Sequence, residues 1–210
     1  PKETLRVLED GQEFEKRSEV IELRPDMCSL TLSSLNFIKQ ASVNSPDIII
    51  RLAEKMEEYG VTPELECFDM GMINYGLYLI GKKVLKGPYY WNLLFGNIAG
   101  FQTSLSQIAA ALKEIPRGHY VGLAGLAGYQ LPVNAIAIAM DYGVRTGVED
   151  NIWWDEGRIR LATNADLIKR VHAIMEIHGS SLMTAKEFGS MGFYNKQRSQ
   201  EHKQAAAIDE

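Results

Sequence analysis

The chain has 210 residues, 46% of them hydrophobic, which is enough for one large domain or two small ones. Its formal charge of -5 argues against a nucleic-acid partner or an anionic membrane surface. Two cysteines are too few for a disulfide scaffold, and no apolar run is long enough to span a bilayer. We therefore expect a cytoplasmic protein with reduced thiols.

The first half of the chain alternates short apolar runs with amphipathic stretches. Ser45-Pro46 is typical of a helix start, because serine caps the first turn and proline suits the first helical position. Gly60 is typical of a helix end. The predicted elements are a helix over 13–23, a strand over 27–32, a helix from Ser45 to Gly60, a strand over 64–69 and a helix over 74–84.

The second half repeats this alternation. Asn164 and Gly179 are the predicted cap and end of the last long helix. The predicted elements are strands over 89–95, 120–123 and from Val144, and helices over 104–115, 131–142, 164–179 and 184–188. Residues 196–210 are polar and predict a frayed tail.

Strands that alternate with amphipathic helices predict βαβ units around a parallel sheet, and we count five strands. A doubly wound open sheet needs only five strands, but the chain has no dinucleotide-binding fingerprint. Polar residues follow every strand, at the edge where both parallel folds carry their sites. A ring of such residues favours a (β/α)8 TIM barrel, where all strand ends converge.

The stretch 144–151 combines charged residues with apolar flanks. On a strand, Arg145, Gly147 and Glu149 would share one face, and Asp150 and Asn151 would lie at the strand mouth. Burying a guanidinium and carboxylates is costly unless they pair with each other or meet a ligand. One carboxylate could then bind a metal or pair with Arg145 while the other reaches a substrate. A structural ion pair with a solvated turn is the alternative.

Other polar residues also lie at predicted strand ends. Ser34 and Asn36 follow the first strand, at the edge that carries the site in either parallel fold, and we expect Asn36 to contact substrate. Glu66 is either an interior carboxylate satisfied by a cation or a substrate contact. None of the four histidines has metal-ligand spacing with another or lies at a strand mouth. A metal site built from this chain would therefore lack its usual nitrogen ligands.

Four stretches of the chain resemble the β-keto acid cleavage enzymes, whose prototype is the 3-keto-5-aminohexanoate cleavage enzyme. They are residues 24–30, 33–37, 63–69 and 144–151, the last with the signature R-x-G-x-E-D-N. The resemblance implies a zinc-dependent (β/α)8 barrel that forms a homo-oligomer, a dimer or more usually a tetramer. It also implies that a β-keto acid and acetyl-CoA react to give acetoacetate and a new CoA ester.

The resemblance further implies roles for four residues. Glu149 corresponds to the zinc ligand of the E-D-N run and Asp150 to the base. Arg145 orients Asp150, and Ser34 is the hydroxyl that contacts substrate. Chemically, zinc would polarise the substrate ketone while a carboxylate removes a proton beside it.

The chain also departs from this family, because it has no His-x-His pair to supply two further zinc ligands. The five strands would be the fourth to eighth of a barrel. We therefore expect residues 1–195 to form a single barrel domain that lacks its N-terminal units, followed by the tail. Two alternatives remain: another metal-dependent barrel aldolase or lyase, and an incomplete barrel that acts as a binding or assembly subunit.

Overall fold

The computed structural model describes residues 10–197, with side chains from residue 14 onward, and it is built around a five-stranded parallel sheet. The two edge strands each have one neighbour among the described residues, and all five strands correspond to predicted ones. In sheet order the strands are β1 (Met27–Thr31), β4 (Thr62–Cys67), β5 (Tyr90–Phe95), β6 (Tyr120–Gly125) and β7 (Gly143–Arg145).

The strands lie in the sheet in the order in which they occur in the chain. A doubly wound sheet reverses its strand order at a switch point, and the described sheet has no such reversal. Because crossovers between parallel strands are right-handed, an order that never reverses places the connecting helices on the same face. This arrangement agrees with an α/β barrel segment and argues against the doubly wound alternative.

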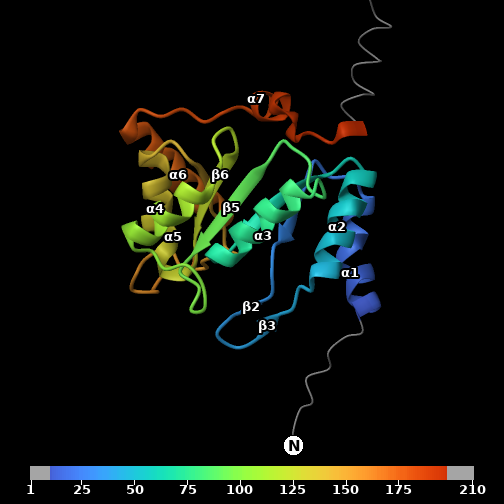
Figure 1. Ribbon diagram of the computed structural model, residues 1–210. Coiled ribbons are helices and arrows are strands. Elements are labelled where there is room, and N and C mark those ends of the chain that lie inside the picture. Colours follow the sequence, from blue (N-terminus) through green and yellow to red (C-terminus); the bar gives the residue numbers. More distant parts are fainter. Residues whose placement is uncertain (1–9, 198–210) are drawn as a thin grey trace, which may run out of the picture.

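Helices connect successive strands, and one more helix, α1, precedes the first strand. Figure 1 shows α1 and α2 side by side. The Ser45 side chain accepts a hydrogen bond from the Ile48 backbone N–H, as the Ser-Pro signal predicts. The helices are α1 (Asp10–Glu22), α2 (Pro46–Glu58), α3 (Met70–Gly81), α4 (Leu105–Glu114), α5 (Gln130–Ala139), α6 (Asn164–His178) and α7 (Ala185–Phe188). None of the helices in this described part is both long and apolar enough to cross a membrane.

Several predicted boundaries were wrong by a few residues, and three of them have a local cause. Helix α3 begins at Met70, because the Asp69 side chain accepts from the Met72 N–H and so caps the helix. Helix α6 is capped by Thr163, one residue before the predicted Asn164. Strand β7 ends at Arg145 instead of continuing toward Glu149. In each case a local hydrogen bond or turn overrides the residue pattern.

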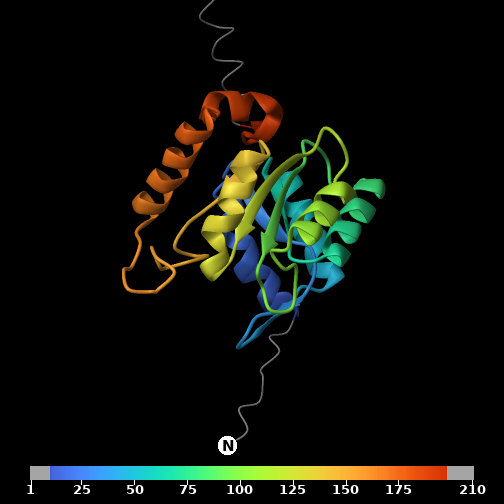
Figure 2. The ribbon, with the colours of Figure 1, turned by 90° about the vertical axis from the view of Figure 1, so that its left-hand side faces the viewer.

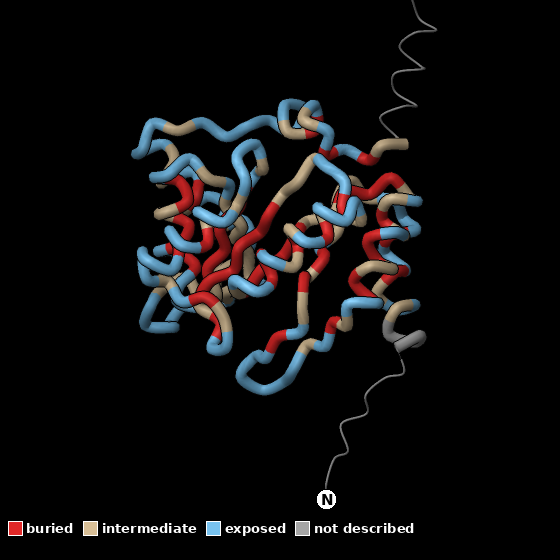
Figure 3. The backbone as a smooth tube through the Cα atoms, viewed as in Figure 1, coloured by how far each residue is buried: buried red, intermediate tan, exposed pale blue. Residues whose placement is uncertain are grey.

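The core lies between the sheet and its helices, where Figure 3 shows buried residues along the strands. Trp91 on β5 is fully buried, and Gly76 on α3 lies against it. A Cβ atom at Gly76 would come within 2.7 Å of the Trp91 ring, so the close approach of α3 requires glycine there. In the hairpin formed by β2 (Leu35–Asn36) and β3 (Ala41–Ser42), Leu35 is buried and residues 36–41 are exposed, as the same figure shows.

The C-terminal segment crosses the sheet at the edge where the strands begin. Figure 1 shows it running from α6 through α7 to a position beside α2. The ring of Phe193, in the π-helix η2 (Gly189–Phe193), packs against Tyr90 and Tyr120, which are the first residues of β5 and β6. Lys196 pairs with Glu57 at 2.9 Å, so the predicted tail does not begin at 196; residues 198–210 lie outside the described range.

Candidate functional site

One face of the sheet carries a row of polar side chains, because residues two apart on a strand share a face. Glu64 and Glu66 lie on that face of β4. The register places Ser29 and Thr31 of β1 beside them, and Asn92 of β5 on the other side. Parallel pairing therefore gathers, from distant parts of the chain, polar groups that no local pattern connects.

Arg145, at the end of β7, is the centre of this cluster. Its Nε donates to Asp150 Oδ2 at 3.1 Å and its Nη2 donates to Oδ1 at 3.3 Å. Its Nη1 donates to Glu66 Oε1 at 2.6 Å, and Nη2 also reaches Glu149 Oε2 at 3.2 Å. One guanidinium thus holds three carboxylates in a fixed arrangement, which its planar, five-donor geometry allows.

The carboxylates reach Arg145 because the chain turns directly after β7. The backbone N–H groups of Asp150 and Asn151 both donate to the Gly147 carbonyl, at 3.3 and 3.2 Å. Gln130 Nε2 donates to the same carbonyl at 2.8 Å and holds the turn against α5. On a strand, the adjacent Glu149 and Asp150 would face opposite ways, but strand alternation does not apply to a turn, and both carboxylates meet Arg145.

A cavity of about 280 Å³ opens beside this cluster at the carboxyl ends of the strands. Its polar lining consists of Thr31, Ser42, Glu66, Arg145, Glu149 and Asp150. Its apolar wall consists of Leu35, Phe37, Phe68, Leu94 and Leu126. The cavity is large enough for a small carboxylic acid and brings an apolar surface and charged groups together, as ligand sites do.

Ser34 and Asn36 lie outside that lining. The Ser34 hydroxyl accepts from the Asn44 N–H at 2.8 Å, and the Asn36 carbonyl accepts from Asn97 Nδ2 at 3.0 Å. Both contacts hold the hairpin in place, and the hydroxyls that line the cavity are those of Thr31 and Ser42. Sequence reasoning missed these two. Thr31 could have been found, because it shares a strand face with Ser29 in the strand that enters the site.

Burial and charge act in opposite directions on Asp150, whose side chain is only 5% exposed. Loss of solvent raises the pKa of this carboxyl above its ordinary value, and the hydrogen bonds and charge of Arg145 partly offset the effect. Burial alone would lower the pKa of Arg145, but its three carboxylates together raise it. Asp150 is thus a more basic carboxylate than an exposed aspartate, and Arg145 remains a cation.

Glu149 differs from its neighbour, because its side chain is 85% exposed. A zinc site needs about four ligands, three of them usually from the protein. Among the described residues, no group of three or more histidine, cysteine, aspartate or glutamate side chains could hold a metal ion. The described part of the chain therefore does not by itself fit the zinc that the resemblance implies, and Glu149 is the one accessible carboxylate of the cluster.

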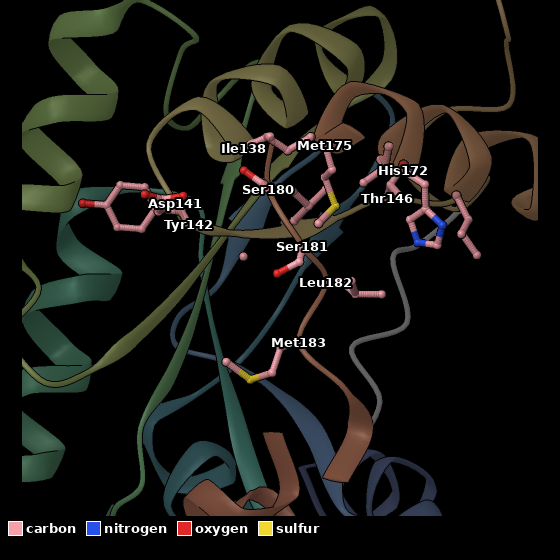
Figure 4. Close-up of a pocket in the computed structure, with 14 residues that line it drawn as sticks. Ile138, Asp141, Tyr142, Thr146, His172, Met175, Ser180, Ser181, Leu182 and Met183 are labelled. Atoms are coloured by element: carbon pink, nitrogen blue, oxygen red, sulfur yellow. The ribbon is translucent and has the colours of Figure 1, made fainter. Parts of the chain in front are cut away.

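A second cavity, of about 390 Å³, lies away from these charges. Figure 4 shows it between α5 and α6, with Ile138, Met175 and Met183 among its walls. Figure 2 shows α6 on the outer side of α5. The lining is mainly apolar, although Asp141 and His172 also belong to it, and it shares no residue with the arginine–carboxylate cluster.

A parallel α/β sheet with an arginine–carboxylate cluster at its strand ends defines an α/β protein with an enzyme-like site. The family model of the beta-keto acid cleavage enzyme matches residues 5–191. The chain belongs to this family, and the resemblance noted in its motifs is confirmed.

Individual relatives agree. The chain is 30% identical over 173 residues to a 3-keto-5-aminohexanoate cleavage enzyme of Fusobacterium nucleatum, covering 82% of this chain and 62% of that protein. It is 28% identical to a 3-oxoadipate:acetyl-CoA acetyltransferase of Cupriavidus necator, covering 82% and 61%. The chain thus spans about three fifths of the length of these relatives.

The fold also resembles a solved structure, that of apo ObcA, with a TM-score of 0.65 and 16% identity. The similarity covers 80% of this chain and 44% of that one. At this identity the likeness concerns the fold alone. It agrees with a parallel α/β sheet whose helices follow each strand.

Proposed function

We propose that this chain forms part of a (β/α)8 enzyme that exchanges the acyl group of a β-keto acid with that of acetyl-CoA. The products are acetoacetate, which keeps the carboxylated methylene of the keto acid, and the CoA ester of the remaining acyl group. The observation that carries the proposal is the buried Asp150 beside a cavity, with both of its oxygens held by the Nε and Nη2 atoms of Arg145. The names of two relatives, which act on a β-keto acid or use acetyl-CoA, support it.

In this proposal Asp150 is the base. Removing a proton beside a carbonyl needs a carboxylate whose pKa is closer to the operating pH than that of a free aspartate, and burial shifts the pKa of Asp150 in that direction. Its fixed position next to the cavity supports the same role. General-base catalysis of this kind contributes about 10²- to 10⁴-fold to a rate.

Arg145 and Glu66 are positioning residues. Arg145 fixes both oxygens of Asp150, and Glu66 fixes Arg145 from the opposite side at 2.6 Å. The sequence left Glu66 open between a substrate contact and an interior carboxylate satisfied by a cation, and its ion pair with Arg145 supports the second. The Thr31 hydroxyl also donates to Glu66, at Oε2 and 2.9 Å.

The zinc ion and the contacts of Ser34 and Asn36 with substrate remain predictions. Glu149, exposed at the cavity, is the described residue that we propose for a metal contact, and further ligands would lie outside the described residues. A homo-oligomer also remains a prediction, as do the cytoplasmic location and the absence of nucleic-acid partners.

The test is acetoacetate formation by the whole enzyme that contains this chain, from acetyl-CoA with a panel of β-keto acids that includes 3-keto-5-aminohexanoate and 3-oxoadipate. We expect product with at least one of them and a loss of about 10²-fold or more in Asp150→Asn. Asp47→Asn, at an exposed pair with Arg51, is the matched control and should keep full activity. Absence of product with every acid, or an active Asp150→Asn variant, would overturn the proposal and favour a binding subunit or another lyase.

A further inference from the structure

Glu64 is a second carboxylate on the polar face of β4, and the proposed chemistry does not use it. It lies two residues before Glu66, farther from the carboxyl end of the strand. Glu66 lines the cavity beside Arg145, and Glu64 is not one of the described residues that line it. Its Oε1 accepts from Asn92 Nδ2 at 2.7 Å. A partly buried carboxylate with so few partners needs an explanation, because removing it from water is costly.

The Ser29 hydroxyl lies between the two carboxylates. Its oxygen is 3.0 Å from Glu64 Oε2 and 3.3 Å from Glu66 Oε1. A serine hydroxyl has a single proton to donate, so it can satisfy only one of these two oxygens at a time. If both carboxyls were ionised, the other contact would bring two oxygen acceptors together without a proton between them. A proton on one carboxyl resolves the conflict.

The surroundings decide which carboxyl holds that proton. Glu66 has the Arg145 guanidinium at 2.6 Å and the Thr31 hydroxyl, and both favour its ionised form. Glu64 has no ion pair among the described side chains, and its nearest partners are the neutral Ser29 and Asn92.

The charged and titratable groups that face Glu64 come from four strands. Burial is the main cause of its raised pKa, and the Glu66 charge on its own strand adds to the effect. The hydrogen bond from Ser29, the charge of Arg145 on β7 and the hydrogen bond from Asn92 lower the pKa of Glu64, but they do not cancel the rise. Tyr90 on β5 and Cys28 on β1 are also near enough for their own pKa values to be raised by Glu64, after burial. The proton therefore belongs on Glu64.

We propose that Glu64 is a positioning residue: its neutral carboxyl donates through Oε2 to Ser29, which directs the single Ser29 proton to Glu66. Glu66 then keeps its charge and its full set of donors, and it holds Arg145 toward Asp150. The hydrogen-bonded series runs from Glu64 through Ser29, Glu66 and Arg145 to the proposed base. Its catalytic part rests on the proposed function, but the protonation of Glu64 does not.

Infrared spectroscopy tests the protonation without any activity assay. Just above the pH at which an ordinary glutamate loses its proton, the folded protein should still show the carbonyl band of a protonated carboxyl group. The band should weaken in Glu64→Gln, with any remainder from Asp150, whose pKa burial also raises, and it should be unchanged in Glu54→Gln, at an exposed position of α2. Absence of the band in the unaltered protein, or an undiminished band in Glu64→Gln, would overturn the proposal even if the enzyme is active.

Kinetics test the positioning role. Glutamine can donate its amide N–H to Ser29, so Glu64→Gln should keep kcat at about pH 6, whereas Glu64→Leu should lower it by about 5- to 10-fold, the loss of one hydrogen bond. In a Ser29→Ala background, Glu64→Leu should cause no further loss. A Glu64→Gln variant as impaired as Glu64→Leu would show that the charge is needed and would overturn the proposal. Urea unfolding of each variant separates these outcomes from a failure to fold.

Discussion

Arg145 meets Asp150 edge to edge, with Nε 3.1 Å from Oδ2 and Nη2 3.3 Å from Oδ1. The two residues are five apart in the chain, and the turn after β7 brings the carboxylate back over the guanidinium. The remaining nitrogen, Nη1, points to Glu66. Every guanidinium nitrogen of Arg145 thus has a carboxylate partner. Among the described side chains, Arg145 is the one that holds the Asp150 carboxylate in place.

Arg145→Gln should destabilise the protein. Removing the cation leaves Asp150 and Glu66, which are 5% and 12% exposed, without a charge partner. Breaking such a buried pair costs about 3 to 5 kcal/mol. Urea unfolding measures this loss, and Lys86→Gln, from an exposed pair with Glu57, should cost less than about 1 kcal/mol. Equal losses in the two variants would contradict the central role of Arg145.

In the pH profile of kcat/KM, the rise on the acid side should occur at a higher pH than the pKa of a free aspartate would give. A base must be ionised to act, so kcat/KM rises with pH through the pKa of Asp150, which burial raises. Arg145 lowers that pKa, so Arg145→Gln should move the rise to still higher pH in whatever activity remains. A rise that moves to lower pH in this variant would contradict the assignment.

The 210-residue chain should bind zinc weakly. Among the described residues no group of three or more potential ligands could hold a metal ion, and a single carboxylate such as Glu149 is a weak site. Equilibrium dialysis followed by metal analysis should find less than one zinc ion per chain. Glu149→Gln should reduce any residual binding, whereas Glu54→Gln should not. One tightly held zinc per chain would contradict this prediction.

Asp69 should contribute to stability and not to catalysis. It follows β4 at the same edge as Glu66, but its side chain caps α3 through the Met72 N–H at 2.9 Å. Asp69→Ala should cost about 1 kcal/mol in urea unfolding, and Asp69→Asn, which can still cap, much less. Both variants should keep kcat. A large loss of activity in the well-folded asparagine variant would show that Asp69 belongs to the site.

Asn195 should anchor the C-terminal segment. It is 1% exposed, and its Nδ2 lies 3.1 Å from the carbonyls of both Pro25 and Tyr59, in the loops before β1 and after α2. Asn195→Ala leaves these buried carbonyls with fewer donors and should cost about 1 to 3 kcal/mol. Tyr194→Phe removes one exposed hydrogen bond, from the hydroxyl to Ala185, and should cost less than about 1 kcal/mol. Limited proteolysis of the segment gives an independent measure.

Local patterns predicted the elements well because capping and periodicity act over a few residues. The Ser45-Pro46 start and the Gly179 end of α6 were both confirmed. The prediction for 144–149 was wrong because a three-residue strand and a turn have the same residue pattern as a longer strand. Nothing in the amino-acid order distinguishes alternation on a strand from a turn that returns toward Arg145.

The sequence by itself determined the alternation of strands and helices. Through the R-x-G-x-E-D-N run it also determined the family and the pairing of Arg145 with the nearby carboxylates Glu149 and Asp150. Only the tertiary structure decided that Glu66, 79 residues before Arg145, is also a partner of this guanidinium. It also decided that Thr31 and Ser42, and not Ser34, line the cavity. Strand register makes this difference. It sets which side chains become neighbours across a parallel sheet, and it depends on the packing of the whole domain.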